Sequence, residues 1–381
     1  MKHATIILAI ATLLLLSACS SSNDNHTNYE SDLQTMLLEA VNETHPGYVL
    51  HIDGPKGEWT LAAGFADVGP QTPMVPTNRL RIGSCTKTFT AAACMLLAQN
   101  GLLDVTQPIT TYLPNTNMPH AGQISVANLL NMTSGLACYL NDDSWVLDEL
   151  AQDIEHQFTV AELLDHAVAL TDPDSMDIGG QWYYCNTNYV LLTQIIEACS
   201  GTTYTNYIEQ HILLPLGMTS TTVSTQPIDM AHGYVDLDDD GLTDDVTSFN
   251  PTYVWGAGCI VSTADDLAKF GRGLFGGGLV SPATLEQMKQ WVEVAPGIFD
   301  YGYGVGQYEQ LEIVGHNGAV PGYAAENWYH VPSGTVVTVL SNSNRIDGDH
   351  TFAVVTQALQ MLGYIEPAEA TGRGLPSAVG L

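Results

Sequence analysis

Positive charge is the scarcest feature of this sequence. Ten Lys and Arg residues stand against 41 Asp and Glu residues, which gives a formal net charge of −31. Binding a polyanion such as nucleic acid requires clustered cations, because each neutralised phosphate needs its own positive group. The composition therefore argues against nucleic acid as a partner. A chain of 381 residues with 45% hydrophobic side chains is also too apolar to be disordered, so we expect a globular protein.

Metal-binding and redox motifs built on cysteine are absent as well. The seven cysteines include no Cys-x-x-Cys pair, and the histidines show no metal-ligand spacing. We therefore predict no metal and no cofactor. For Cys85 and Cys185 we favour the interpretation of small buried side chains, while the sequence leaves any disulfide pairing open.

The apolar run near the N-terminus, residues 4–16, is too short to span a bilayer as a permanent helix. It follows Lys2 and His3 and leads into Ser17 and Ala18, which is the layout of a bacterial signal peptide. We expect residues 1–19 to be this signal and the polar residues 20–31 to be a flexible tether.

The sequence Leu16-Ser17-Ala18-Cys19 resembles the lipobox of bacterial lipoproteins. The resemblance implies lipidation of Cys19, and Ser20 after it implies the outer membrane. We therefore expect a lipid-anchored protein of the cell envelope, facing the periplasm or the exterior. The alternative is an ordinary secretory signal in which the Cys is incidental.

Helix and strand patterns at the two ends of the chain predict an α+β fold. At the start, a helix over 32–43 precedes strands over 47–52 and 58–65; at the end, strands over 303–308, 311–316, 323–331 and 335–341 precede a helix over 351–362. We expect one antiparallel sheet built from both termini and flanked by helices, within a domain spanning 32–365. Helical spacing over 126–131, 160–166, 184–199 and 204–211 predicts a mainly α-helical inserted subdomain at about 102–261. Residues 366–381 are expected to be a loose tail.

The sequence Ser84-Cys85-Thr86-Lys87 places a Ser and a Lys on one face at the start of a long apolar helix over 84–100. A serine hydroxyl becomes a good nucleophile only when a neighbouring base takes its proton, and burial lowers the pKa of a Lys enough for that role. The helix N-terminus also favours developing negative charge. A bare Ser-x-x-Lys is nevertheless common by chance.

Two later segments support a catalytic role for this motif. They are Tyr184-Cys185-Asn186, which opens another apolar helix, and His316-Asn317-Gly318-Ala319. In order and spacing, the three segments resemble the Ser-x-x-Lys, Tyr-x-Asn and Lys/His-x-Gly motifs of the class C β-lactamase and D-alanyl-D-alanine carboxypeptidase superfamily. The resemblance covers about residues 32–362. Further segments that look like family landmarks are 129–136, 215–218, 256–258, 262–267 and 301–306.

The resemblance implies a serine hydrolase in which Ser84 forms an acyl-enzyme while Lys87 and Tyr184 share the general-base role. Tyr184 would then protonate the leaving group. Asn186 would hold the substrate amide or the Lys87 ammonium. The backbone N–H groups of Ser84 and Ala319 would form the oxyanion hole.

The third motif is expected to bind substrate. Gly318 would let its strand approach the substrate closely, and His316 would be the cation that tunes the site. His316 as the base of a Ser/His/Asp triad is the alternative that we weigh against this.

The acidic segment 236–245 imitates a calcium loop, because acidic residues alternate before Gly241. An EF-hand would require a Glu at its twelfth position, where Thr247 stands. We favour a solvated acidic hairpin and keep a structural calcium ion as the alternative.

The His at the start of the third motif resembles DD-carboxypeptidases, which implies a peptidase acting on peptidoglycan-type peptides. Residues 307–312 offer no Arg for the substrate carboxylate, and Asn317 and Ala319 replace hydroxyl residues that help bind it. A short-chain carboxylesterase and a class C-like β-lactamase therefore stay open as alternatives. A non-catalytic, penicillin-recognising envelope lipoprotein is the alternative outside the enzymes.

Overall fold

The computed structural model describes residues 29–141, 145–146, 149–150, 153, 156–226, 228–236, 243–344 and 349–366. Cys19, the expected signal peptide, most of the tether and nearly all of the tail lie outside these residues. Within the described ranges, no helix has both the length and the apolar character needed to cross a membrane.

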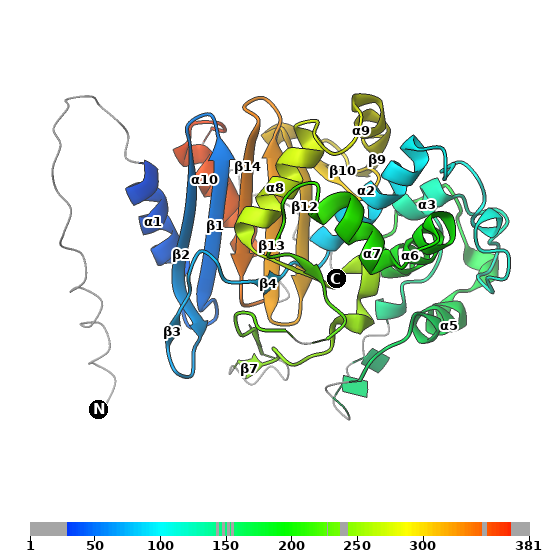
Figure 1. Ribbon diagram of the computed structural model, residues 1–381, viewed down its shortest axis with the longest axis horizontal. Helices are drawn as coiled ribbons and strands as arrows, with labels where there is room; N and C mark the ends of the chain where they lie inside the picture. The colour runs from blue at the N-terminus through cyan, green and yellow to red at the C-terminus, as the bar shows by residue number, and fades with distance from the viewer. Residues whose placement is uncertain are drawn as a thin grey trace.

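The centre of the fold is a nine-stranded sheet with the order β3-β2-β1-β14-β13-β12-β11-β10-β9 (Figure 1). All neighbouring strands pair antiparallel, and β1 pairs with β14, so the two ends of the chain meet inside one sheet. The strands are β1 (Gly47–Gly54), β2 (Gly57–Asp67), β3 (Thr72–Pro73), β9 (Val292–Ala295), β10 (Phe299–Tyr301), β11 (Gly306–Tyr308), β12 (Ile313–Val320), β13 (Tyr323–His330) and β14 (Thr335–Ser341).

Helices cover both faces of this sheet. On one face, α1 (Tyr29–Ala40) and α10 (Asp349–Met361) pack on side chains such as Leu50 and Ile52 of β1. On the other face, α8 (Ala264–Phe275) packs on β1, β13 and β14, and α2 (Cys85–Gln99) packs on β12. Val49 belongs to this second core, as expected from the alternation of side chains along a strand.

The remaining helices gather beside the sheet, around α2 (Figure 1). They are α3 (Val126–Leu130), α5 (Val160–Leu170), α6 (Asn186–Ser200), α7 (Tyr204–Ile208) and α9 (Pro282–Met288). A small sheet joins β4 (Leu80–Arg81), β8 (Ile260–Ser262) and β5 (Thr222–Val223), and β6 (Tyr234–Val235) pairs with β7 (Asp244–Asp245). Helix α6, which begins at Asn186 of the second motif, contacts α2 as well as α3, α5 and α7. The helices of the first two motifs therefore pack on each other within this cluster.

The predicted α+β fold with a sheet built from both termini is confirmed. Some boundaries differ. Helix α1 begins at Tyr29 rather than at 32, so residues 29–31 are helical and not tether; Glu30 and Asp32 in its first turn suit the helix dipole. The strand expected over 303–308 begins only at Gly306, because Gly302 N–H donates to the carbonyl of Val305 and closes a turn. Strands β9 and β10 were not expected.

Candidate active site

Ser84 occupies the N-cap position of α2, yet its side chain makes no capping hydrogen bond and is 4% exposed. Gly83 before it has φ +47°, and a Cβ there would lie 2.7 Å from the backbone nitrogen of Ala319. A glycine is therefore required for the turn from β4 into α2. This turn leaves the Ser84 hydroxyl free for other partners.

Lys87 is fully buried one turn further along α2, and its Nζ lies 2.9 Å from Ser84 Oγ and 3.0 Å from the carbonyl oxygen of Ala257. Burial lowers the pKa of Lys87 to about 7, against weaker opposing effects of the thiols of Cys138, Cys185 and Cys85. A substantial share of the amine is then neutral at physiological pH. A neutral amine at hydrogen-bond distance can accept the proton of Ser84.

Two landmark segments position α2 by hydrogen bonds. Thr90 Oγ1 donates to the carbonyl of Gly256 at 2.7 Å, beside the Ala257 carbonyl that contacts Lys87. Thr88 Oγ1 donates to the carbonyl of Gly304 at 2.7 Å. Both segments resemble family landmarks in sequence, but this backbone role could not be predicted, because a carbonyl acceptor does not depend on the type of side chain.

Tyr184 lies over Lys87, with the ring centroid 4.7 Å from Nζ. Burial raises the pKa of Tyr184 well above its usual range, and the nearby Tyr301 adds to the rise, while a hydrogen bond with Ser84 works in the opposite direction. The phenol therefore keeps its proton at neutral pH. The structure thus brings Ser84, Lys87 and Tyr184 together, as the motifs predicted.

The loop that carries Tyr184 is held by residues 132–139. Tyr183 N–H donates to the carbonyl of Met132 at 2.9 Å, and Thr187 Oγ1 donates to the carbonyl of Ala137 at 2.8 Å. These bonds fix the chain on both sides of the phenol.

Asn186 is the first residue of α6 and is 3% exposed. Its backbone N–H and its side-chain Nδ2 donate to the sulfur of Cys138, at 3.3 and 3.5 Å. Hydrogen bonds from Cys185 and Asn186 lower the pKa of Cys138. In this structure the side-chain Nδ2 of Asn186 therefore donates to the thiol of Cys138, while the partners of the Lys87 amine are Ser84 and Ala257. The other expected role of Asn186, holding the substrate amide, stays a prediction. Cys138 is a neighbour that sequence reasoning did not connect with the site.

Strand β12 packs directly against the start of α2. A Cβ on Gly318 would lie 2.0 Å from the carbonyl oxygen of Ile82 and 2.8 Å from the backbone nitrogen of Ser84. The bare backbone at Gly318 allows this approach. The backbone nitrogen of Ala319 is likewise close to Gly83. The backbone nitrogens of Ser84 and Ala319 therefore both lie at the contact between β12 and the start of α2, where an oxyanion hole was expected.

His316 is buried and neutral. Its Nδ1 donates to the carbonyl of Asn317, so Nε2 is the acceptor for Tyr301 Oη at 3.0 Å. Burial lowers the pKa of His316 to about 3, with a smaller contribution from Lys87. The expectation that His316 is a cation is therefore wrong, because the strand register buries it. Both ring nitrogens are engaged away from Ser84, so the alternative Ser/His/Asp triad is not formed.

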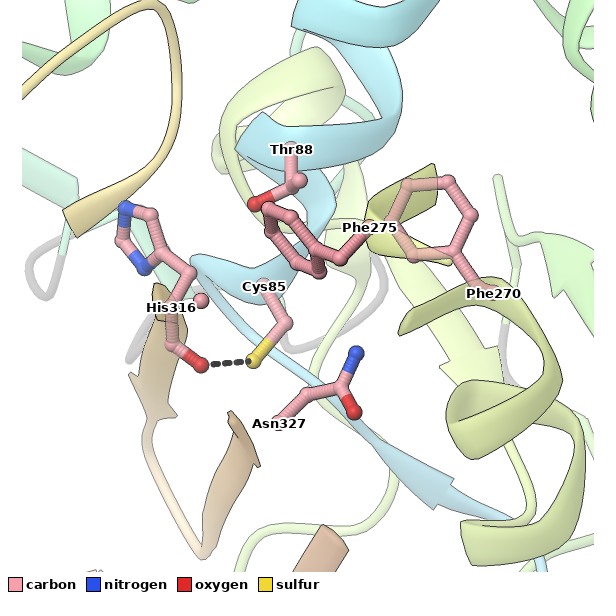
Figure 2. A pocket seen from close by; sticks show the side chains of 7 residues that line it. Cys85, Thr88, Phe270, Phe275, His316 and Asn327 are labelled. Atoms are coloured by element: carbon pink, nitrogen blue, oxygen red, sulfur yellow. Dashed lines mark hydrogen bonds between the residues drawn. The ribbon is translucent and has the colours of Figure 1, made fainter. Parts of the chain in front are cut away.

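The region behind His316 is tightly packed. Figure 2 shows His316, Cys85, Thr88, Phe270, Phe275 and Asn327 around a space that admits no water molecule. Cys85 Sγ donates to the carbonyl of His316 at 3.2 Å. Cys85 and Cys185 are both buried, as predicted for small core side chains.

Asn317 and Ala319 alternate with His316 and Gly318 along β12 and are partly exposed. Strand alternation directs the Asn317 side chain to the face opposite Gly318, away from Ser84. The backbone nitrogen of Ala319 lies next to Gly83, and its part in an oxyanion hole stays a prediction.

In the acidic segment, β6 and β7 form an antiparallel pair, while residues 237–242 between them lie outside the described residues. Asp245 pairs with His232 Nδ1 at 2.7 Å. The choice between a solvated hairpin and a calcium loop stays open.

Comparisons with known proteins show the family of this chain. A family model described as Beta-lactamase matches residues 37–360. Penicillin-binding protein 4* of Bacillus subtilis (strain 168) is 30% identical over 355 residues, which cover 88% of this chain and 76% of that protein.

Solved structures with the same fold include amide hydrolases. The D-amino acid amidase of Ochrobactrum anthropi SV3 superposes with a TM-score of 0.78 at 26% identity, over 88% of this chain and 99% of the amidase chain. A D-stereospecific amidohydrolase from Streptomyces sp. superposes with a TM-score of 0.77 at 27% identity, over 86% of this chain and 98% of its own.

Proposed function

This chain belongs to the beta-lactamase family of serine hydrolases, and on that basis we propose that it is a D-alanyl-D-alanine carboxypeptidase-like peptidase. Its substrates would be short peptidoglycan-type peptides that end in a D-amino acid. The observation that carries the proposal is the 2.9 Å contact between Ser84 Oγ and the buried amine of Lys87. The relatives named penicillin-binding protein and D-amino acid amidase support a peptidase or amidase role.

In the acylation step, neutral Lys87 accepts the proton of Ser84, and Ser84 Oγ attacks the scissile carbonyl. The backbone N–H groups of Ser84 and Ala319 stabilise the negative charge on the tetrahedral oxygen. Tyr184, whose raised pKa keeps it protonated, donates a proton to the leaving amine. The opposite pKa shifts of Lys87 and Tyr184 thus support assigning the base role to the amine and the acid role to the phenol.

In the second step, a water molecule attacks the acyl carbon and the ester bond to Ser84 breaks. Tyr184, now deprotonated, takes the proton of this water, and Lys87, which still carries the proton that it accepted from Ser84, returns that proton to Ser84 Oγ. Ser84 regains a proton as the acid product leaves, so the site returns to its starting state.

The substrate carboxylate has a weak anchor in this chain. Residues 307–312 contain no Lys or Arg, and His316 is neutral. We therefore propose that D-amino acid amides and esters are accepted alongside free peptide ends, since neither group needs a cationic partner.

A panel of substrates tests the proposal. We expect release of D-alanine from an acetylated peptide ending in D-Ala-D-Ala, no release from its L-Ala-L-Ala counterpart, and no turnover by Ser84→Ala. Preferential turnover of an uncharged short acyl ester would favour the esterase, and rapid turnover of a cephalosporin the β-lactamase. Intact-mass measurement over hours after adding a β-lactam separates a lasting adduct on Ser84 from a transient one. Absence of both turnover and adduct would leave the non-catalytic binder.

We also propose that the protein is a lipoprotein of the cell envelope, anchored through Cys19 and facing the periplasm or the exterior. The lipobox-like residues before Cys19 support this. A Cys19→Ser variant should appear in the soluble fraction, whereas Cys199→Ser should stay with the membranes. Equal membrane association of both variants would contradict the anchor.

A further inference from the structure

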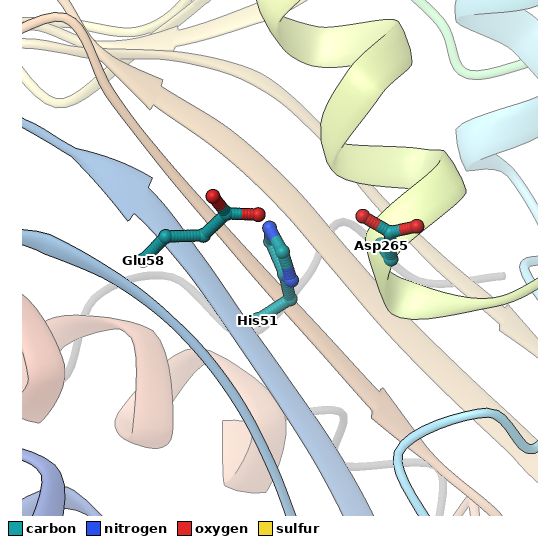
Figure 3. Close-up of side chains that lie close together, drawn as sticks. All are labelled: His51, Glu58 and Asp265. Atoms are coloured by element: carbon teal, nitrogen blue, oxygen red, sulfur yellow. The ribbon is translucent and has the colours of Figure 1, made fainter. Parts of the chain in front are cut away.

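His51, Glu58 and Asp265 come together on the α8 side of the sheet, outside the active site (Figure 3). They belong to three elements: His51 to β1, Glu58 to β2 and Asp265 to the first turn of α8. One nitrogen or carboxylate oxygen of each lies within 4.8 Å of the others. Their positions in the sequence have no metal-ligand spacing, so only the hairpin register and the packing of α8 reveal the group.

His51 is oriented as metal-binding histidines are. It is 2% exposed, and its Nδ1 lies 2.8 Å from Oγ1 of Thr60, its cross-strand partner on β2. Among the described residues, Nε2 has no hydrogen-bond partner, and Figure 3 shows the ring directed between the two carboxylates. A hydrogen bond at one ring nitrogen that fixes the other toward a metal is a regular feature of such sites.

The carboxylates of Glu58 and Asp265 differ in how freely their side chains can move. Glu58 is exposed and can adjust its position, while Asp265 is half-buried and uses one oxygen to contact Lys269 Nζ at 2.8 Å. The other Asp265 oxygen remains available. Figure 3 shows both carboxylates on either side of the imidazole.

The surrounding charges leave an excess of negative charge. Lys269 also contacts Asp266 at 3.0 Å, and Arg272 pairs with Asp53, the next residue on this face of β1. The region thus holds four carboxylates, those of Asp53, Glu58, Asp265 and Asp266, against two cationic side chains. A divalent cation would neutralise the remaining charge, in a protein whose formal charge is −31.

We propose that His51, Glu58 and Asp265 bind a divalent transition-metal ion, with Zn²⁺ as the best match. One imidazole and two carboxylates suit zinc in a tetrahedral site completed by water, whereas Ca²⁺ prefers oxygen ligands alone. The site lies three strands from β12, about 14 Å at the usual strand spacing. The metal therefore joins the β1–β2 hairpin to α8 and takes no part in the chemistry at Ser84.

The competing explanation is a protonated His51 that bridges the two carboxylates without metal, and it predicts no saturable zinc binding.

Calorimetric titration of the EDTA-treated full chain with ZnCl₂ tests the proposal, together with the thermal midpoint with and without zinc. The informative variants are Glu58→Gln and Asp265→Asn. Each replaces a carboxylate by an amide of nearly the same size and leaves the buried His51 in place. Glu293→Gln is the matched control, an exposed carboxylate on β9 at the far end of the sheet. His51→Gln is a third variant, whose result is used only where it folds.

We expect one zinc ion per chain and a zinc-dependent rise in the thermal midpoint. Glu58→Gln and Asp265→Asn should each weaken binding by about tenfold or more, while Glu293→Gln should bind as the parent does. Two outcomes overturn the proposal. One is no saturable zinc binding; the other is binding that both ligand variants retain unchanged, which would place the ion elsewhere.

Discussion

The side-chain amide of Asn186 donates to the sulfur of Cys138, 3.5 Å away, although its family role was expected to involve Lys87 or the substrate. The backbone N–H of Asn186 donates to the same sulfur at 3.3 Å. Both groups are buried. Cys138 is therefore the acceptor for two buried N–H donors of Asn186, the first residue of α6, close to Tyr184 in the sequence.

Cys138→Ala should accordingly cost more stability than Cys138→Ser. The alanine removes the acceptor and leaves buried donors unsatisfied, at a cost of about 1–3 kcal/mol, whereas the serine oxygen can still accept. Urea unfolding of both variants measures the difference. Equal midpoints for the two variants would show that the sulfur does not support Asn186.

Ser84→Ala should abolish turnover without unfolding the protein. The hydroxyl contacts Lys87 Nζ, and Lys87 keeps the Ala257 carbonyl as a partner when the hydroxyl is removed. We expect a loss of at least about a thousandfold in kcat with an unchanged thermal midpoint. Ser175→Ala, at an exposed position, is the control. Substantial residual activity of the Ser84 variant would require another nucleophile.

Much of this arrangement could be predicted because it depends on local periodicity. The spacing of Ser84 and Lys87 on one helix, and the strand patterns at both ends of the chain, are properties of short segments. Strands β9 and β10 escaped prediction because they have only four and three residues and leave little periodic signal.

The charge of His316 and the partner of Asn186 could not be predicted in the same way. Burial of His316 depends on how β12 pairs and on Tyr301 from β10, and the Asn186 contact joins two segments far apart in the sequence. The grouping of His51 with Asp265 could not be predicted for the same reason, because these residues are far apart in the sequence. Such contacts are set by tertiary packing and not by the residues around each motif.

The pH dependence of kcat/KM should report the protonation of Lys87. The amine must be neutral to accept the Ser84 proton, so activity should rise as the pH increases through about 7. His316→Asn should keep this transition, because burial lowers the pKa of His316 to about 3, outside the assay range. Loss of the transition in that variant would assign it to the histidine instead.

The lowered pKa of Lys87 also predicts how the stability of the protein depends on pH. The pKa of Lys87 falls from 10.5 in the unfolded chain to about 7 in the folded protein, so between these values the unfolded chain binds more protons. The contribution of Lys87 to the free energy of unfolding should therefore increase as the pH rises from 7 to 10.5. Urea midpoints of the parent and Lys87→Met across this window isolate the contribution. A parallel pH dependence in both proteins would contradict it.

Gly318→Ala tests whether the contact between β12 and α2 builds the oxyanion hole. The added methyl would lie 2.0 Å from the carbonyl oxygen of Ile82 and 2.8 Å from the nitrogen of Ser84, and neither backbone atom can move aside cheaply. The strand must then shift away from α2, which separates the N–H groups of Ser84 and Ala319.

Losing one oxyanion donor costs about 10² to 10³ in kcat, so a fall of this size is expected for Gly318→Ala. The effect on KM should be smaller, since the hole acts on charge that develops only in the transition state. Gly122→Ala is the matched control, because nothing lies within 4 Å of the position its methyl would occupy. If Gly318→Ala raised KM and left kcat unchanged, the contact would position the substrate and would not stabilise its developing negative charge, and the two backbone nitrogens would lose the role assigned to them.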